Sequence, residues 1–174
     1  MKKIAVNILI ISLFALTNVV CAQRIIPPSD ELKIEGMVKT VLKFSLKDLE
    51  QFPTQPIKDL EIVNHNGEFK GVAKQLRGFP LKNLLDKIEF AVEKPKELNE
   101  YYLCLVATDG YKVVFSWNEI FNTEIGDQIF IITEKEGKKL AETDERILAV
   151  SASDLKIGRR YIKGLSTIKV NKTD

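Results

Sequence analysis

The segment from Tyr102 to Ile120 constrains the fold more than any other part of the chain. It reads YLCLVATDGYKVVFSWNEI, in which two apolar runs flank Asp109-Gly110. An Asp-Gly pair between two such runs predicts a β-hairpin, because both residues tolerate the positive φ angles of a tight turn. Ser116 and Glu119 follow with the spacing of a helix capping box. The segment therefore predicts two antiparallel strands and a short helix that runs through Phe121.

Alternating apolar residues and turn signals predict more strands along the chain. Leu32 and Ile34 alternate with Lys33 and Glu35, as in a half-buried strand. Asn66-Gly67 is a second hairpin signal. By the same patterns, strands are expected at residues 32–36, 41–44, 57–65, 69–72, 128–133, 146–151 and 165–170, in addition to the hairpin over residues 101–115.

Two further short helices are expected. Ser45 and Asp48 have the spacing of a helix cap, and a second helix is predicted to begin at Pro80, a favoured first helical position. Apolar residues with helical spacing follow Pro80, namely Leu81, Leu84, Leu85 and Ile88. The predicted fold class is α+β: a single strand-rich domain with two or three short helices.

The N-terminus has the pattern of a secretory signal peptide, expected over residues 1–22. Lys2 and Lys3 precede an apolar run, and Val20-Cys21-Ala22 has the small-residue spacing of a cleavage site. A membrane anchor is the alternative, but the run is shorter than the roughly 20 residues of a spanning helix. Lipidation of Cys21 is a third possibility, although Asn18 and Val20 match that motif poorly. The expected location is periplasmic or secreted.

The rest of the chain is expected to form a leader and one domain. Pro27-Pro28 predicts an extended leader over residues 23–31, and residues 32–174 are long enough for one core. Removing Lys2 and Lys3 from the 26 basic residues leaves 24, against 24 acidic residues. A nucleic-acid partner is not expected, because phosphate binding needs a basic excess or stripe.

Cys104 would be the one cysteine left after cleavage, so no internal disulfide is expected. It lies between Leu103 and Leu105 in an apolar strand pattern. We interpret it as a small buried hydrophobic residue. A reactive thiol would need a neighbouring cation or helix start, and the local sequence provides neither.

Four segments in order resemble the molybdopterin-binding domain of sulfite-oxidase-like oxidoreductases. The resemblance covers about residues 32 to 170. Its motifs are an opening strand with a glycine followed by Phe-Ser-Leu-Lys-Asp-Leu, a "G-x-P-L-x-x-L-L" helix entry, an "A-x-D-G-Y" hairpin and an "R-W-V-K-x-L-x-x-I" ending. They correspond here to residues 32–49, 78–85, 107–111 and 160–168.

The resemblance implies the fold but not the family's redox centre. Family members bind molybdenum through a cysteine that precedes the "G-x-P-L" helix, and residues 60–78 of this chain contain no cysteine. Cys104 follows that helix and does not correspond to it. The chain is more similar to small exported versions of the domain that lack the cysteine. A shared fold does not establish a shared reaction.

The resemblance also suggests where a ligand would bind. The candidate cofactor-binding or ligand-binding residues are His65, Arg77, Asp109, Arg160 and Lys163. Each has a structural alternative: His65 and Asp109 could simply form turns, and the three basic residues could be ordinary surface charges. His65 is the single histidine, and one histidine does not make a metal site, so no metal ligands are assigned.

Three functions are consistent with these residues. The first is a non-redox binding module for a small anionic ligand or a partner protein, with no cofactor. The alternative is a molybdopterin-dependent oxidoreductase, in which Arg77, Arg160 and Lys163 hold the pterin and electrons pass to another exported protein. The third is a purely structural interaction domain. No catalytic residue is assigned.

Overall fold

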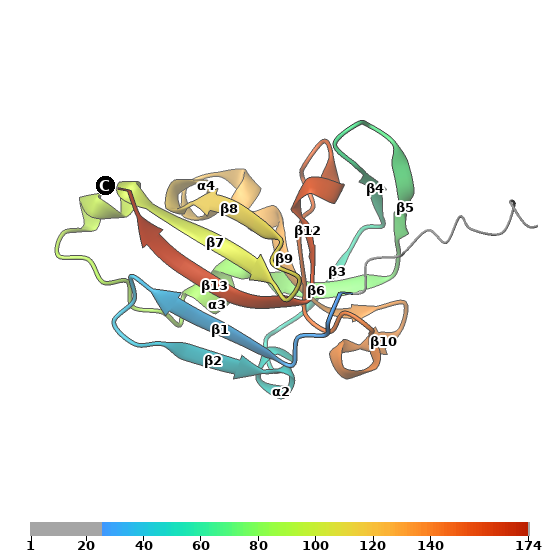
Figure 1. Cartoon of the computed structure of the whole chain (residues 1–174), viewed down its shortest axis with the longest axis horizontal. Coiled ribbons are helices and arrows are strands. Elements are labelled where there is room, and N and C mark those ends of the chain that lie inside the picture. Colours follow the sequence, from blue (N-terminus) through green and yellow to red (C-terminus); the bar gives the residue numbers. More distant parts are fainter. Residues whose placement is uncertain (1–25, 174) are drawn as a thin grey trace, which may run out of the picture.

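The computed structural model describes residues 26–173, so the expected signal peptide, Cys21 and the first residues of the leader lie outside the described residues. The first sheet has the strand order β2-β1-β13-β7-β8 (Figure 1). β1 pairs with β13 in parallel, and the other neighbours are antiparallel. Its strands are β1 (Glu31–Gly36), β2 (Leu42–Ser45), β7 (Tyr101–Ala107), β8 (Lys112–Ser116) and β13 (Leu165–Lys172).

The second sheet has the order β12-β11-β9-β6-β3, with the short β10 paired to β9. Its neighbouring strands all pair antiparallel within the described residues. Its strands are β3 (Gln55–Ile57), β6 (Leu76–Pro80), β9 (Ile129–Lys135), β10 (Lys138–Lys139), β11 (Leu148–Ser151) and β12 (Tyr161–Lys163). A separate hairpin of β4 (Leu60–Val63) and β5 (Phe69–Ala73) stands beside β12 in Figure 1.

Short helices join the strands. The α-helices of the described chain are α2 (Leu46–Leu49), α3 (Leu81–Leu85) and α4 (Trp117–Phe121). The 3-10 turns are η1 (Pro95–Glu100), η2 (Glu124–Gln128), η3 (Leu140–Glu142) and η4 (Ile157–Arg160). The α+β class with three short helices is therefore confirmed, and none of the described helices has the length and apolar character needed to cross a membrane.

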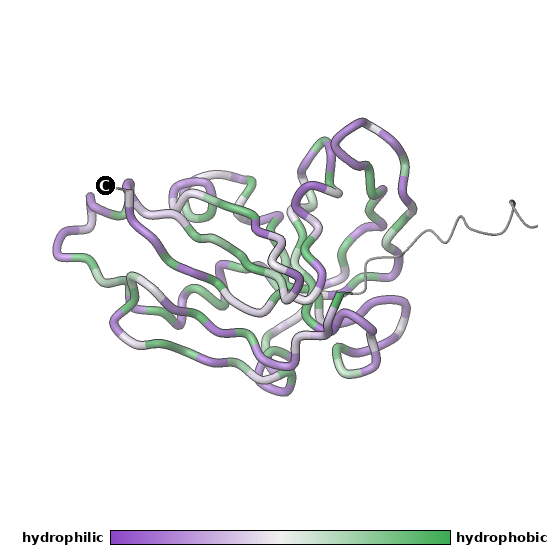
Figure 2. Tube along the Cα trace, viewed as in Figure 1, coloured by the Kyte–Doolittle hydropathy of each residue, from purple (hydrophilic) through white to green (hydrophobic). Residues whose placement is uncertain are grey.

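Two apolar clusters hold the sheets together. The larger one contains the inward residues of the first sheet, such as Leu103, Leu105 and Ile168, with α3 and part of β9. The smaller one lies between the second sheet and the β4–β5 hairpin, around Leu60 and Val150. Figure 2 shows the strands changing repeatedly between hydrophilic and hydrophobic residues, as expected when one face of a sheet is buried.

The predicted helix caps are present. The backbone N–H of Asp48 donates to Ser45 Oγ at 3.3 Å, and the backbone N–H of Ser45 donates to Asp48 Oδ2 at 2.8 Å. Ser116 Oγ accepts from the backbone N–H of Glu119 at 3.0 Å. These bonds satisfy N–H groups that a helix start leaves without partners.

The predicted strand over residues 57–65 is wrong as a single element. Ile57 ends β3, which pairs with β6, whereas Leu60 begins β4, which pairs with β5. The chain changes direction at Lys58-Asp59, where Asp59 Oδ1 accepts from the backbone N–H of Gln75 at 3.1 Å. Tertiary pairing overrides the continuous apolar pattern here.

The second predicted helix begins one residue later than expected. Pro80 ends β6 and caps α3, whose first residue is Leu81. The strand β6 itself was not predicted. It places Gly78 so close to β9 that an added Cβ would lie 2.3 Å from the carbonyl oxygen of Ile131. This close approach explains why glycine occupies the position.

Cys104 is half-buried, so its interpretation as a buried hydrophobic residue is wrong. Residues alternate between the two faces of β7, and Cys104 shares the outer face with Tyr102 and Val106. The fully buried positions on this strand belong to its neighbours Leu103 and Leu105.

Leu105 should be a sensitive test of the larger core. It is 0% exposed, so Leu105→Ala should lower the free energy of unfolding by about 2–5 kcal/mol through lost burial and the cavity left behind. Val114 on neighbouring β8 is 54% exposed, and Val114→Ala should cost under about 1 kcal/mol. Urea denaturation of both variants measures the difference, and equal costs would contradict the assigned faces.

Candidate functional site

The candidate site consists of two hollows that share one wall. The first has a volume of about 230 Å³ and is lined by Ile26, Asp109, Tyr111, Gly158, Tyr161 and Lys163. The second has a volume of about 290 Å³ and is lined by Ile62, Lys70, Gly71, Val72, Ala73, Lys135, Glu136, Tyr161 and Lys163. We call the two together the Tyr161–Lys163 groove.

The strand β12 supplies the shared wall. It lies at the edge of the second sheet, where its inward residue Ile162 is 1% exposed. Tyr161 and Lys163, on either side of Ile162, point to the opposite face because strand residues alternate. One short edge strand therefore presents an aromatic ring and an ammonium group together.

Lys163 is held by a carboxylate behind the groove. Its Nζ lies 2.7 Å from Oε1 of Glu145, whose side chain is 15% exposed. Burial by itself raises the pKa of Glu145, but the hydrogen bond from Lys163 and the charges of Lys163 and Lys135 outweigh it and hold the pKa below its ordinary value. The ion pair therefore restricts where the ammonium group of Lys163 can lie.

Tyr161 stays protonated well above neutral pH. Burial, followed by the negative charges of Glu145 and Glu136, raises the pKa of the Tyr161 phenol to about 12. The groove therefore offers a neutral phenol and an aromatic face rather than a phenolate.

Asp109 lies in the first hollow and also forms the predicted turn. Its Oδ1 accepts from the backbone N–H of Tyr111 at 2.9 Å, as in an Asx-type turn. The Tyr111 hydroxyl donates to the carbonyl oxygen of Arg159, which ties the β7–β8 turn to η4. The structural and ligand-facing interpretations of Asp109 are thus compatible.

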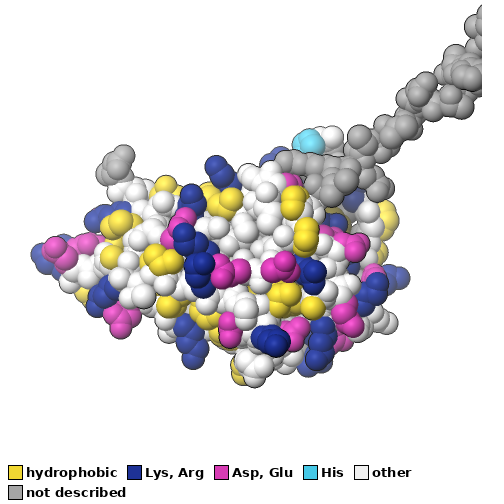
Figure 3. Space-filling model, turned by 60° about the horizontal axis from the view of Figure 1, so that its bottom comes forward, with side chains coloured by type: hydrophobic (Ala, Val, Ile, Leu, Met, Phe, Trp, Pro, Cys, Tyr) yellow, Lys and Arg dark blue, Asp and Glu magenta, His cyan; other side chains and the backbone are white. Residues whose placement is uncertain are grey.

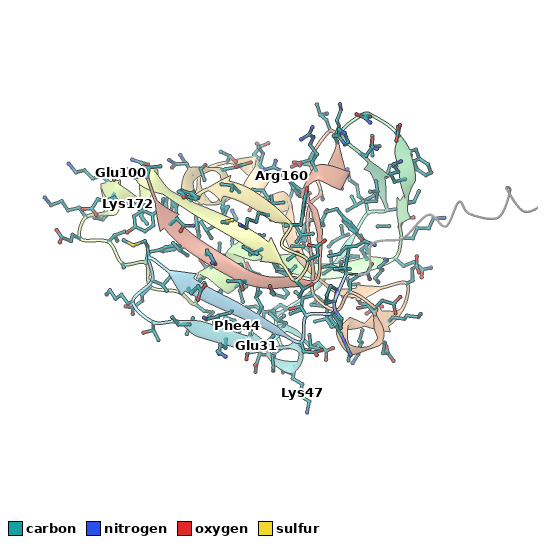
Figure 4. The ribbon with its side chains drawn as sticks, viewed as in Figure 1. Glu31, Phe44, Lys47, Glu100, Arg160 and Lys172 are labelled. Atoms are coloured by element: carbon teal, nitrogen blue, oxygen red, sulfur yellow. The ribbon has the colours of Figure 1, made fainter. Side chains whose placement is uncertain are left out.

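Arg160 is engaged within the protein. Its Nε and Nη2 donate to the two carboxylate oxygens of Asp154, each at 2.6 Å, and its Nη1 donates to Glu119. The guanidinium also lies 4.5 Å from the ring centroid of Phe115. The hydrogen bonds that Arg160 donates to Asp154, against the opposing effect of burial, raise the pKa of Arg160 above its ordinary value. Figure 4 labels this side chain, which lies at the end of η4.

His65 and Arg77 line neither hollow. His65 is exposed in the β4–β5 turn, where its carbonyl oxygen accepts from Nζ of Lys156 at 2.9 Å. Arg77 is exposed on β6, where its Nη2 lies 3.4 Å from both oxygens of Thr54. Of the five candidate residues, the structure brings Asp109 and Lys163 together in one hollow.

The sequence interpretation missed most of the groove. Tyr161 stands next to two selected residues in the Arg-Tyr-Ile-Lys motif, so its position was available as a signal. Lys70, Lys135 and Glu145 belong to other strands or loops and gave no local signal. Within residues 26–173, no three His, Cys, Asp or Glu side chains are grouped as metal ligands would be.

Glu145 should make stability depend on acid pH. Because its folded pKa lies below the ordinary 4.5, the pair with Lys163 should stabilise the fold above that pH and be lost as pH falls through the lower folded value. Glu145→Gln should therefore flatten the fall in melting temperature on acidification. Glu89→Gln breaks the exposed Lys39–Glu89 pair, which solvent screens, and serves as the control. Equal acid profiles for Glu145→Gln and the unaltered protein would contradict this role.

No model of a protein family matches the chain, and no curated protein matches it. Among solved structures, the fold is similar to that of the sulfane dehydrogenase SoxCD from Paracoccus pantotrophus. The TM-score is 0.57 at 15% sequence identity, and the match covers 82% of this chain and 38% of that one. The chain thus spans well under half of the dehydrogenase chain, and the likeness shows a shared fold.

Proposed function

We propose that this protein is an exported, non-redox binding module and that its Tyr161–Lys163 groove binds a small anionic ligand. The observation that carries the proposal is the charge of the second hollow. Lys70, Lys135 and Lys163 line it from three different strands, and Glu136 is the carboxylate of the lining. Glu68 and Glu145, which pair with Lys70 and Lys163, are outside the lining. Ammonium groups that converge on a partly enclosed space favour an anion, because burial strengthens their attraction relative to open water.

The same hollow has an apolar side. Ile62, Val72, Ala73 and the ring of Tyr161 belong to its lining. A ligand that combines an anionic group with a small apolar or planar body would use both sides, as is common in small-molecule sites. The grouping of lysines in this hollow is a local feature. On the face of the molecule that Figure 3 draws, positive and negative side chains are mixed.

Calorimetric titration can test anion binding with inorganic phosphate and benzoate as probes. Benzoate should bind more tightly than phosphate, because its ring can cover the apolar side of the groove. Lys135→Gln should weaken benzoate binding by roughly tenfold, since a charge-assisted hydrogen bond is worth about 1.5–3 kcal/mol. It is a cleaner variant than Lys163→Gln, which also removes the ion pair between Lys163 and Glu145.

Lys169→Gln is the matched control for this titration. Lys169 is an exposed lysine on β13 with a carboxylate neighbour, Glu35, but it lies outside the groove. It should leave binding unchanged, and raising the salt concentration should weaken binding to the unaltered protein. Equal losses in Lys135→Gln and Lys169→Gln, or no binding of either probe, would sink the proposal.

A molybdopterin-dependent oxidoreductase is the second candidate, favoured by the four motifs and by the fold shared with a dehydrogenase. The described residues do not fit that group in the predicted way. Arg160 is committed to Asp154 and Glu119, and Arg77 lies outside the groove. The thiol of Cys104 is on the outer face of the first sheet. We therefore derive no reaction through a pterin or a metal.

Metal and pterin analysis separates the two candidates. The protein should be isolated after export from a host that makes the cofactor. We expect neither stoichiometric molybdenum nor a released fluorescent pterin, because the soft sulfur ligand that molybdenum favours is missing from the groove. Near-stoichiometric amounts of both would establish the oxidoreductase and overturn the non-redox module.

A further inference from the structure

The leader residues Ile26 and Pro27 lie against the first hollow of the groove. Ile26 belongs to its lining. An added Cβ at Gly164, which directly follows Lys163, would lie 2.9 Å from the carbonyl oxygen of Pro27 and 3.2 Å from Cγ2 of Ile26. The glycine has a φ of +65° and leaves the space that the leader occupies. One wall of the hollow is therefore a segment far from the other walls in sequence.

The leader is fixed firmly from Ser29 onward. Ser29 is buried and forms a parallel bridge with Arg146. Nε of Arg146 also lies 3.2 Å from Oδ1 of Asp30. The hydroxyl of Ser29 donates to the carbonyl oxygen of Glu31, the first residue of β1, at 3.0 Å. These contacts give the leader a fixed base directly before the first sheet.

The preceding residues Ile26 and Pro27, which we call the leader tip, are held more lightly. The hydroxyl of Thr108 donates to the carbonyl oxygen of Pro27 at 2.5 Å. Pro27 and Pro28 are both exposed, and proline has no N–H with which to add a backbone hydrogen bond. Their rings also fix φ, so the tip should move as one stiff piece about the base at Ser29. A segment that is fixed at one end and lightly held at the other has the form of a lid.

The first hollow suits the neutral part of a ligand. Besides Ile26, its lining includes the rings of Tyr111 and Tyr161. Its charged residues, Asp109 and Lys163, offset one another formally, whereas lysines predominate in the lining of the second hollow. An apolar cavity of about 150 Å³ holds benzene. The first hollow, at about 230 Å³, therefore has room for a phenyl ring and a short chain.

We propose that the leader tip is a lid on the first hollow and that it closes over the apolar end of an aryl-alkyl carboxylate. The carboxylate group is bound at Lys163, which lines both hollows, and the ring lies between Tyr161 and Ile26. An ammonium group has three donors, so Lys163 can bind the ligand while it keeps its pair with Glu145. This inference rests on the anion-binding function proposed above, and it adds the length of the ligand and the segment that encloses it.

Calorimetric titration of the exported protein with benzoate and 4-phenylbutyrate tests the site. 4-Phenylbutyrate should bind roughly tenfold more tightly, because its longer body reaches Ile26 and each buried methylene adds affinity. Ile26→Ala should weaken 4-phenylbutyrate binding about three- to tenfold and leave benzoate binding unchanged. Thr108→Val removes the hydroxyl but keeps the shape of the side chain. It should weaken 4-phenylbutyrate binding about two- to tenfold, the equivalent of one net hydrogen bond.

Thr123→Val is the matched control. The hydroxyl of Thr123 also donates to a backbone carbonyl, that of Glu119, at 2.8 Å, but Thr123 lies outside both hollows. It should leave the binding of both probes unchanged. Thr108→Val should keep the melting temperature of the unaltered protein, because the exposed carbonyl of Pro27 can bond to water once the hydroxyl is removed.

Methyl NMR of labelled isoleucine side chains follows the lid itself. In the ligand-free protein, the Ile26 methyl signal should show exchange on the µs–ms timescale of lid opening. Thr108→Val should raise the ratio of open to closed lid about two- to tenfold. Saturation with 4-phenylbutyrate should suppress the exchange. Ile168 is 0% exposed in the larger core and serves as the internal reference that shows no exchange.

Other outcomes would overturn the lid. A flat exchange profile for Ile26, in both the unaltered protein and Thr108→Val, would make the leader a fixed wall. Equal affinities for the two probes, or 4-phenylbutyrate binding that ignores Ile26→Ala and Thr108→Val, would place the apolar end of the ligand elsewhere. In these cases benzoate binding that depends on Lys135 would still support the anion site. No binding of either probe would remove both proposals, so the two failures are distinguishable.

Discussion

The contacts of the Arg160 guanidinium are the interaction on which the rest of the structure most depends. It joins Asp154 in the loop after β11, Glu119 on α4 and the ring of Phe115 on β8. Arg160 itself ends η4, directly before the edge strand β12, so one side chain ties the segment between β11 and β12 to α4 and to β8 of the first sheet. Tyr161 follows immediately and enters the groove wall. A partly buried cation with bidentate carboxylate contacts gives this junction a defined geometry.

The rest of the fold is stabilised by the burial of apolar side chains. Strands of the first sheet place alternate side chains in the larger core, and the hairpin covers the smaller one. The groove forms where these two units meet, at an edge strand whose outward residues are polar or amphipathic. Binding surfaces often arise at such junctions, because packing holds the backbone while side chains at the edge stay available.

Local signals predicted the elements whose information lies within a few residues. The Asp109-Gly110 hairpin and the caps at Ser45 and Ser116 are examples, as is the α+β class. The strands β6 and β12 were missed because pairing partners remote in sequence define them. Of the residues that line the site, Lys163 and Asp109 could each be selected from the sequence as candidate ligand-binding residues. The engagement of Arg160 could not be foreseen, because its carboxylates are 6 and 41 positions away.

The pairing of β1 with β13 has a consequence for the order in which the chain can mature. Residues 33–36 lie in parallel beside residues 167–170, and β13 is the middle strand of its sheet. In a chain that is made from its N-terminus first, the central strand β13 becomes available only after almost the whole domain has been synthesised. Until then β1 lacks its neighbour, and loop-closure entropy opposes early assembly. Such a topology leaves the first sheet incomplete until synthesis is nearly finished.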